Sequence, residues 1–177
     1  MCGFQVVFIG VHLPSYIINQ QLDVAPGTAA LALIGLFKIF GTYSAGMFGA
    51  RYSKPRLLTM LYALRAIVIT YLIAVSVTKI SVSGFSIAMG LLWLSTVPLT
   101  NGTLASVFGV RNLSMLGGIV YFFHQVGSFF GGWLCGLVYD RTGSYDLAWY
   151  ISIVLIVLAA VCIGLSQSVR SNERILR

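Results

Sequence analysis

Six long apolar runs, separated by short polar turns, make up most of this sequence. They cover residues 3–18, 28–48, 57–77, 82–107, 113–139 and 147–166. A membrane-spanning helix needs about 20 mostly apolar residues, because its backbone polar groups must be hydrogen-bonded within the bilayer core. The pattern therefore predicts an all-α membrane protein, with six transmembrane helices in one bundle that occupies the whole of residues 1–177.

Composition supports the membrane class. The chain is 58% hydrophobic and only 8% charged, whereas a soluble domain carries roughly 25% charged residues. The bilayer is thus the first partner that we expect. Although the net charge is +7, the basic residues lie mostly at the ends of apolar runs and form no continuous patch, so we expect no nucleic-acid binding.

The sequence contains no pattern typical of an enzyme or a metal site. The three cysteines lie scattered in apolar runs, and an odd, scattered set does not indicate a disulfide framework. It has no metal-ligand spacing, no phosphate-binding glycine loop beside a lysine, and no nucleophile with a neighbouring base. We therefore expect no enzymatic activity, no cofactor and no metal.

A short basic turn between the second and third runs sets the predicted orientation. It extends from Gly46 to Arg56 and contains Arg51 and Lys54, with no acid nearby. Connections on alternate sides carry seven and two basic residues. The larger set is Arg51, Lys54, Arg56, Arg111, Arg170, Arg174 and Arg177, and the smaller set is Lys79 and Arg141. The positive-inside rule then places the basic turn and the C-terminus in the cytoplasm, in a cytoplasmic (inner) membrane.

Small residues and prolines within the runs predict how the helices pack. Glycines recur at four-residue spacing as Gly127 with Gly131 and Gly132 with Gly136, and Gly41 lies within the second run. Such spacing lets helix backbones approach closely. Pro98 falls inside the fourth run, where we expect a kink.

The basic turn carries a resemblance to a known family. Gly46-Met-Phe-Gly-Ala-Arg-Tyr-Ser-Lys-Pro-Arg56 resembles the Gly-x-x-x-Asp-Arg-x-Gly-Arg-Arg loop between helices eight and nine of major facilitator superfamily transporters. Ala50 replaces the acid and Ser53 the second glycine, which weakens any latch that this acid forms. Over essentially its whole length the chain is similar to the C-terminal half of that fold, helices seven to twelve. The resemblance implies two inverted three-helix repeats, and an N-terminal six-helix half as a missing partner.

Further stretches resemble one branch of this superfamily. Gly143-Ser-Tyr-Asp146 resembles the outer loop between helices eleven and twelve in the monocarboxylate and oxalate/formate-type branch, and Cys2-Gly-Phe-Gln5 and Gly10-Val-His-Leu-Pro14 resemble its helix seven. This implies alternating-access transport of small organic anions such as monocarboxylates, by symport or antiport, with proton coupling left open.

Lys38 is the leading candidate for substrate binding. It lies ten residues from either end of its span, which is roughly 15 Å deep and beyond full snorkelling. Its helical neighbours include Gly35, Gly41 and Thr42, so we expect it to face other helices or a cavity. Since no span of this half holds a deep acid, three alternatives stay open: a substrate carboxylate or an acid of the missing half balances the charge, or the lysine itself is deprotonated. Arg65 is expected to snorkel toward the cytoplasm instead.

Other polar residues are candidates for the lining of a substrate cavity. His124 and Gln125 lie in the middle of the fifth run, and a histidine there could relay a proton or bond across helices. Gln5, His12 and Tyr16 form a polar stripe on the first run. Asn101 lies beside a threonine face of the fourth run, where threonines commonly bond back to their own helix.

Several functions remain open from the sequence alone. An inactive truncated fragment and a membrane interaction subunit are alternatives to a half transporter, and a carrier of a sugar or drug is an alternative within the superfamily. The DNA upstream of the reading frame distinguishes them, because a half transporter requires six further spans.

Overall fold

The computed structural model describes residues 2–20 and 24–175, and within these ranges it is a bundle of α-helices without strands. The helices are α1 (Cys2–Asn19), α2 (Val24–Arg51), α3 (Lys54–Ala74), α4 (Lys79–Trp93), α5 (Thr96–Phe108), α6 (Leu113–Thr142) and α7 (Asp146–Ile175), with a 3-10 turn, η1 (Val110–Asn112), before α6. Six segments are long and apolar enough to cross a membrane, α4 and α5 together forming the fourth. The all-α, six-span prediction is confirmed.

The fourth span is interrupted, and not merely kinked. α4 ends at Trp93 and α5 begins at Thr96, so that Leu94 and Ser95 form a turn between them. Pro98 then falls in the first turn of α5, where its missing N–H removes no helical hydrogen bond. Pro98, which could not continue α4, is thus accommodated in the first turn of a new helix that begins at Thr96.

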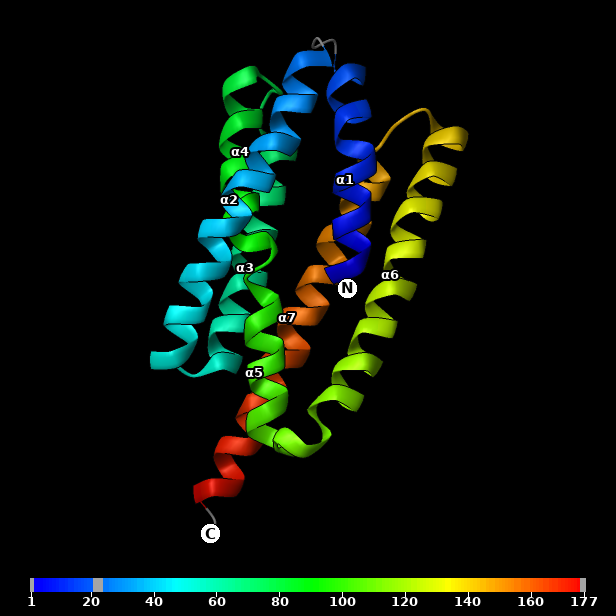
Figure 1. Ribbon diagram of the computed structural model, residues 1–177. Coiled ribbons are helices and arrows are strands. Elements are labelled where there is room, and N and C mark those ends of the chain that lie inside the picture. Colours follow the sequence, from blue (N-terminus) through cyan, green and yellow to red (C-terminus); the bar gives the residue numbers. More distant parts are fainter. Residues whose placement is uncertain (1, 21–23, 176–177) are drawn as a thin grey trace.

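The helices pair in a pattern that relates the first three spans to the last three. The most extensive contacts join α2 with α4, α1 with α6, and α3 with α7, and Figure 1 shows α1 alongside α6 and α2 alongside α4. In two three-helix repeats, α1 corresponds to α4, α2 to α6 and α3 to α7. Under this correspondence the α1–α6 pair is equivalent to the α4–α2 pair, and the α3–α7 pair is equivalent to itself. The pairing is that expected for two inverted three-helix repeats.

Glycines permit the close crossing of α2 and α4. A Cβ atom added to Gly41 would lie 2.1 Å from the carbonyl oxygen of Leu91. Gly90 likewise faces the backbone of Ile34, where an added Cβ would lie 2.9 Å from the carbonyl oxygen. Each helix therefore contributes one glycine to the crossing.

The α1–α6 crossing is built in the same way. A Cβ atom added to Gly131 would lie 2.2 Å from the carbonyl oxygen of Phe4, and one added to Gly3 would lie 1.9 Å from that of His124. The prediction of close glycine packing is thus confirmed at Gly41 and Gly131. Equivalent crossings in both halves reinforce the repeat relationship.

A cluster of buried aromatic side chains connects the two three-helix repeats. Trp149 of α7 is 1% exposed. Its ring lies 4.6 Å from that of Phe8, 5.3 Å from that of Tyr16 and 6.3 Å from that of Phe85, measured between centroids. Because α1, α4 and α7 all contact one buried indole, their relative positions are well determined at this level of the bundle.

The orientation can be tested by thiol labelling. The α2–α3 turn and η1 lie at one end of the bundle, and the α3–α4 and α6–α7 connections at the other (Figure 1). In a variant without native cysteines, we expect Ser144→Cys to react with an impermeant maleimide on intact cells, and Ser53→Cys to react only after permeabilisation. Labelling in the reverse order would contradict the cytoplasmic assignment of the basic turn.

Close packing at Gly41 predicts a steric effect with a control on the same helix. Gly41→Ala should lower the thermal unfolding temperature in detergent, because overpacking against the Leu91 backbone costs roughly 1–3 kcal/mol. Gly46→Ala should leave it unchanged or raise it slightly, since nothing lies within 4 Å of that position and alanine is the better helix former. Equal effects of the two changes would exclude a tight crossing at Gly41.

Candidate functional site

The interruption of the fourth span exposes backbone groups in the middle of the bundle. Carbonyls in the last turn of α4 lack intrahelical donors, and in a membrane they have no water to bond. Side chains from two other positions approach them. Ser95 Oγ lies within hydrogen-bonding distance of Leu91 O and is 2.9 Å from Gly41 O, so the turn is bonded to α2 as well as to α4.

Arg65 of α3 provides the main donors to the break. Its Nη2 donates to the carbonyl of Leu92 at 2.5 Å and to that of Trp93, and its Nη1 lies 3.6 Å from Cys2 Sγ. The side chain is 1% exposed, so the prediction that Arg65 snorkels to the cytoplasmic surface is wrong. The physical reason is that a guanidinium fork matches several carbonyls at the negative end of a helix.

Lys38 lies on the other side of the same break. Its Nζ is 4.4 Å from the ring centroid of Trp93, the last residue of α4, in a cation–π arrangement. Among residues whose side chains the structure describes, the acids are Asp140 and Asp146, which lie at and just after the end of α6. The described part of the bundle thus brings two deep cations to the break and no carboxylate.

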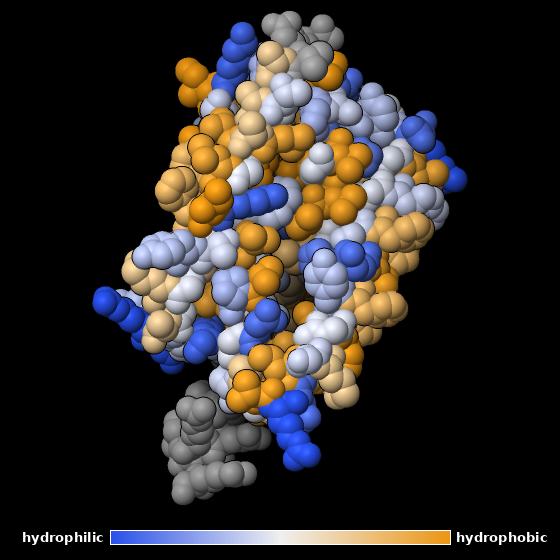
Figure 2. Space-filling model, in the orientation of Figure 1, coloured by the Kyte–Doolittle hydropathy of each residue, from blue (hydrophilic) through white to orange (hydrophobic). Residues whose placement is uncertain are grey.

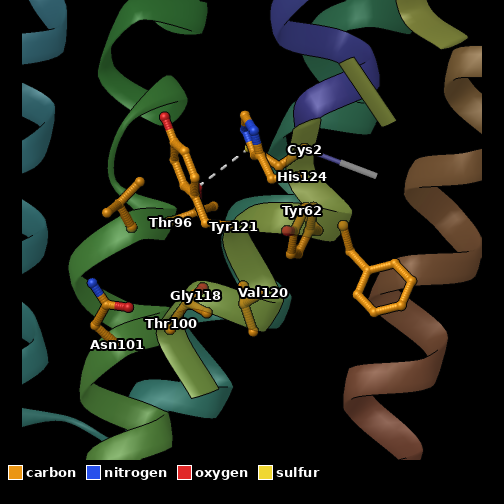
Figure 3. A pocket seen from close by; sticks show the side chains of 12 residues that line it. Cys2, Tyr62, Thr96, Thr100, Asn101, Gly118, Val120, Tyr121 and His124 are labelled. Carbon is orange, nitrogen blue, oxygen red and sulfur yellow. Dashed lines mark hydrogen bonds between the residues drawn. The ribbon is translucent and has the colours of Figure 1, made fainter. Parts of the chain in front are cut away.

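A pocket of about 680 Å³ opens beside the break. Thr96, Thr100 and Asn101 of α5 line it on one side, and Tyr121 and His124 of α6 face them. Figure 3 shows Cys2 next to His124, with a hydrogen bond of 3.7 Å between Cys2 Sγ and Thr96 Oγ1. Tyr62 of α3 also lines the pocket. The walls are mostly apolar with a few neutral polar groups, which is usual for small-molecule sites.

Tyr121 and His124 form a flat aromatic surface within this pocket. Their ring centroids lie 5.7 Å apart and their planes differ by 4°. They are three residues apart on α6, so their side chains emerge from the same face of the helix. His124 also lies beside Cys2 at the wall of this pocket.

The structure brings together only some of the residues that the sequence suggested. His124 and Asn101 line the pocket, whereas Lys38 lies at the break over the Trp93 ring and is not among the lining residues. Gln125 is exposed on α6 and is not among the lining residues.

The polar stripe of α1 bonds to neighbouring helices. Gln5 Nε2 donates to Ser152 Oγ at 3.2 Å, and His12 Nε2 lies 3.1 Å from the carbonyl of Gly132. Tyr16 is 5% exposed and packs edge-on against Trp149. In this arrangement the stripe connects α1 to α6 and α7 instead of facing the pocket.

The basic turn packs against the half of the fourth span that carries the pocket. Arg51 ends α2 and Lys54 begins α3, while Arg56 is exposed and Gly46 faces open space. The methylene chain of Lys54 fills the space above Gly102 of α5, where an added Cβ would lie 2.7 Å from Lys54 Cδ. The turn is therefore fixed to α5.

Sequence reasoning missed the break itself and the residues that depend on it, chiefly Arg65, Trp93, Thr96 and Tyr121. One signal was present, because the polar pair Ser95 and Thr96 lies shortly before Pro98 within an apolar run. Interrupted membrane helices occur where the free backbone lies in protein or lines a cavity.

Comparison with known proteins identifies a transporter to which this chain is similar. No protein-family model matches the chain. The chain is similar to a curated protein of Bacillus subtilis (strain 168), named as the uncharacterized MFS-type transporter YcxA, with 27% identity over 165 residues. The similarity covers 90% of this chain and 40% of the relative, so the chain spans about two fifths of the relative's length.

The role of Arg65 can be tested by substitution. Arg65→Met leaves the carbonyls of Leu92 and Trp93 without donors, and each unsatisfied buried group costs roughly 1–3 kcal/mol. We expect a lower thermal unfolding temperature in detergent, with partial recovery in Arg65→Lys. Arg56→Met, at an exposed position on the same helix, should have little effect. An unchanged unfolding temperature in Arg65→Met would show that these bonds do not support the break.

Proposed function

We propose that this chain is the C-terminal six-helix half of a major facilitator superfamily secondary transporter, which works by alternating access with an N-terminal half. Three observations support this proposal. The described helices form six apolar spans. They pair as expected for two inverted three-helix repeats, and the chain is similar to an MFS-type transporter. The membrane is the cytoplasmic one, with the C-terminus inside.

In this proposal the substrate site opens on the face shown in Figure 2, where hydrophilic and hydrophobic residues together border a hollow near the middle of the molecule. Lys38, Asn101 and His124 are the residues that contact the substrate in this proposal. Large exposed apolar side chains continue along the flanking helices, among them Ile39 and Tyr43 of α2. Lipid and the N-terminal half cover these side chains.

A small organic anion is the substrate class that the charges favour. The observation that carries this proposal is the ammonium group of Lys38, which lies over the Trp93 ring without a described carboxylate. An uncompensated cation at membrane depth is costly, and a substrate carboxylate reduces that cost each time it binds. His124 is the residue that would carry a coupling proton.

Substitution of Lys38 tests this function. We measure uptake of a radiolabelled monocarboxylate into vesicles that contain this chain together with an N-terminal six-helix half. Lys38→Ala should lower uptake at least tenfold, because the charge pair with the substrate is lost, and Lys38→Arg should retain part of it.

Lys79→Ala serves as the control, since Lys79 is an exposed cation at the start of α4. Undiminished uptake in Lys38→Ala would overturn the role of Lys38. Failure of the unsubstituted protein to take up any carboxylate would favour an inactive fragment or a carrier of another solute.

A further inference from the structure

The walls of the pocket point to a narrower substrate class than small anions in general. We infer that the transported anion is an aryl carboxylate, with its ring in the pocket beside Tyr121 and His124 and its carboxylate toward Lys38. This inference rests on the proposed transport function and specifies the substrate of that site.

The size of the pocket is the first argument. Its volume of about 680 Å³ lies in the middle of the range of roughly 300–1,000 Å³ that is usual for sites of drug-sized ligands. A two- or three-carbon acid would leave most of this volume unfilled, and dispersion contacts with the apolar walls would be lost. The pocket therefore suits an anion with a bulky apolar part.

The shape of the walls distinguishes a ring from an alkyl chain. Tyr121 is 63% exposed, so that its face is accessible, and it lies parallel to the His124 ring within 4°. Tyr62 and Phe123 add further aromatic surface. Aromatic pairs prefer offset-stacked or edge-to-face contacts worth about 0.5–1.5 kcal/mol beyond area burial, and a flat ligand ring can make both kinds here.

The charges around the pocket select an anion. The guanidinium of Arg65 lies directly behind two lining residues, with Cζ 5.7 Å from the Tyr62 ring centroid and Nη1 3.6 Å from Cys2 Sγ. No acid is among the described residues that line the pocket. The resulting positive potential favours a carboxylate and opposes an aromatic amine of the same shape.

A single ligand can reach both the ring site and Lys38. Ser95 Oγ lies 2.9 Å from Gly41 O of α2, and Lys38 precedes Gly41 by three residues on the same face of that helix. Thr96, the residue after Ser95, lines the pocket, so the cation and the aromatic pocket both adjoin the break. An aryl carboxylate has its charge and its ring at opposite ends, as this arrangement requires.

The test compares three acids by isothermal titration in detergent, on the full chain together with the N-terminal six-helix half used for the uptake measurement. Phenylacetate, cyclohexylacetate and acetate share a carboxylate and differ in their apolar part. We expect phenylacetate to bind at least tenfold more tightly than acetate and at least threefold more tightly than cyclohexylacetate. Phenethylamine, which has a ring and a positive charge, should not bind.

Two substitutions on α6 provide a matched pair. Tyr121→Ala should abolish the preference for phenylacetate while leaving acetate binding unchanged. Phe122→Ala removes an adjacent aromatic residue of similar exposure, 64%, that does not line the pocket, and should leave the preference intact. Because both side chains are mostly exposed, neither change removes buried packing, and a monodisperse elution profile verifies the fold.

The outcomes separate the inference from the function on which it rests. If no carboxylate binds, the proposed function fails with the inference. If acetate and phenylacetate bind equally well and both require Lys38, the function stands and the aryl preference is wrong. If cyclohexylacetate matches phenylacetate, or Tyr121→Ala keeps the preference, apolar volume and not ring contact selects the ligand, and the inference is overturned.

Discussion

The bonding of free carbonyls at the end of α4 is the constraint on which the candidate site depends. In a bilayer these groups need protein donors, and Arg65 donates to the carbonyls of Leu92 and Trp93 while Ser95 donates to that of Leu91. The same bonds determine where Trp93 and Thr96 lie, and these two residues position the cation–π contact and one wall of the pocket. A buried arginine without a described acid is costly in isolation, and helix-end carbonyls, which carry partial negative charge, reduce that cost. The break and the arginine thus stabilise one another.

Glycines at the helix crossings allow the backbones around this site to approach closely. The α2–α4 pair is in close backbone contact at Gly41, and the α1–α6 pair at Gly131. Contacts of this kind hold each pair together by packing between complementary surfaces, because apolar side chains gain little from association inside lipid. The pocket lies between α5, the second half of the fourth span, and α6, where the helix contacts are fewer. Close packing within pairs and looser packing between them leaves room for a ligand.

The sequence predicted the membrane class and the six spans because hydrophobic length is a strong constraint in a bilayer. It also predicted the depth of Lys38, since depth follows from position in the span. It did not predict the partners of polar side chains. Arg65 was expected to reach water because only its own helix was considered, whereas its carbonyl partners lie about thirty residues away, on α4. Gln5 and His12 share one face of α1, but periodicity cannot say whether that face meets a cavity or, as here, other helices.

The packing of Lys54 on Gly102 has a consequence for how the basic turn is connected to the pocket. The methylene groups of Lys54 lie against α5, so the α2–α3 turn and α5 are in direct contact. Gly102 lies six residues after Thr96, which is about 9 Å along the helix. Because α5 is a continuous helix over this length, a displacement of the α2–α3 turn would be passed along it to Thr96 and to the pocket wall that α5 carries.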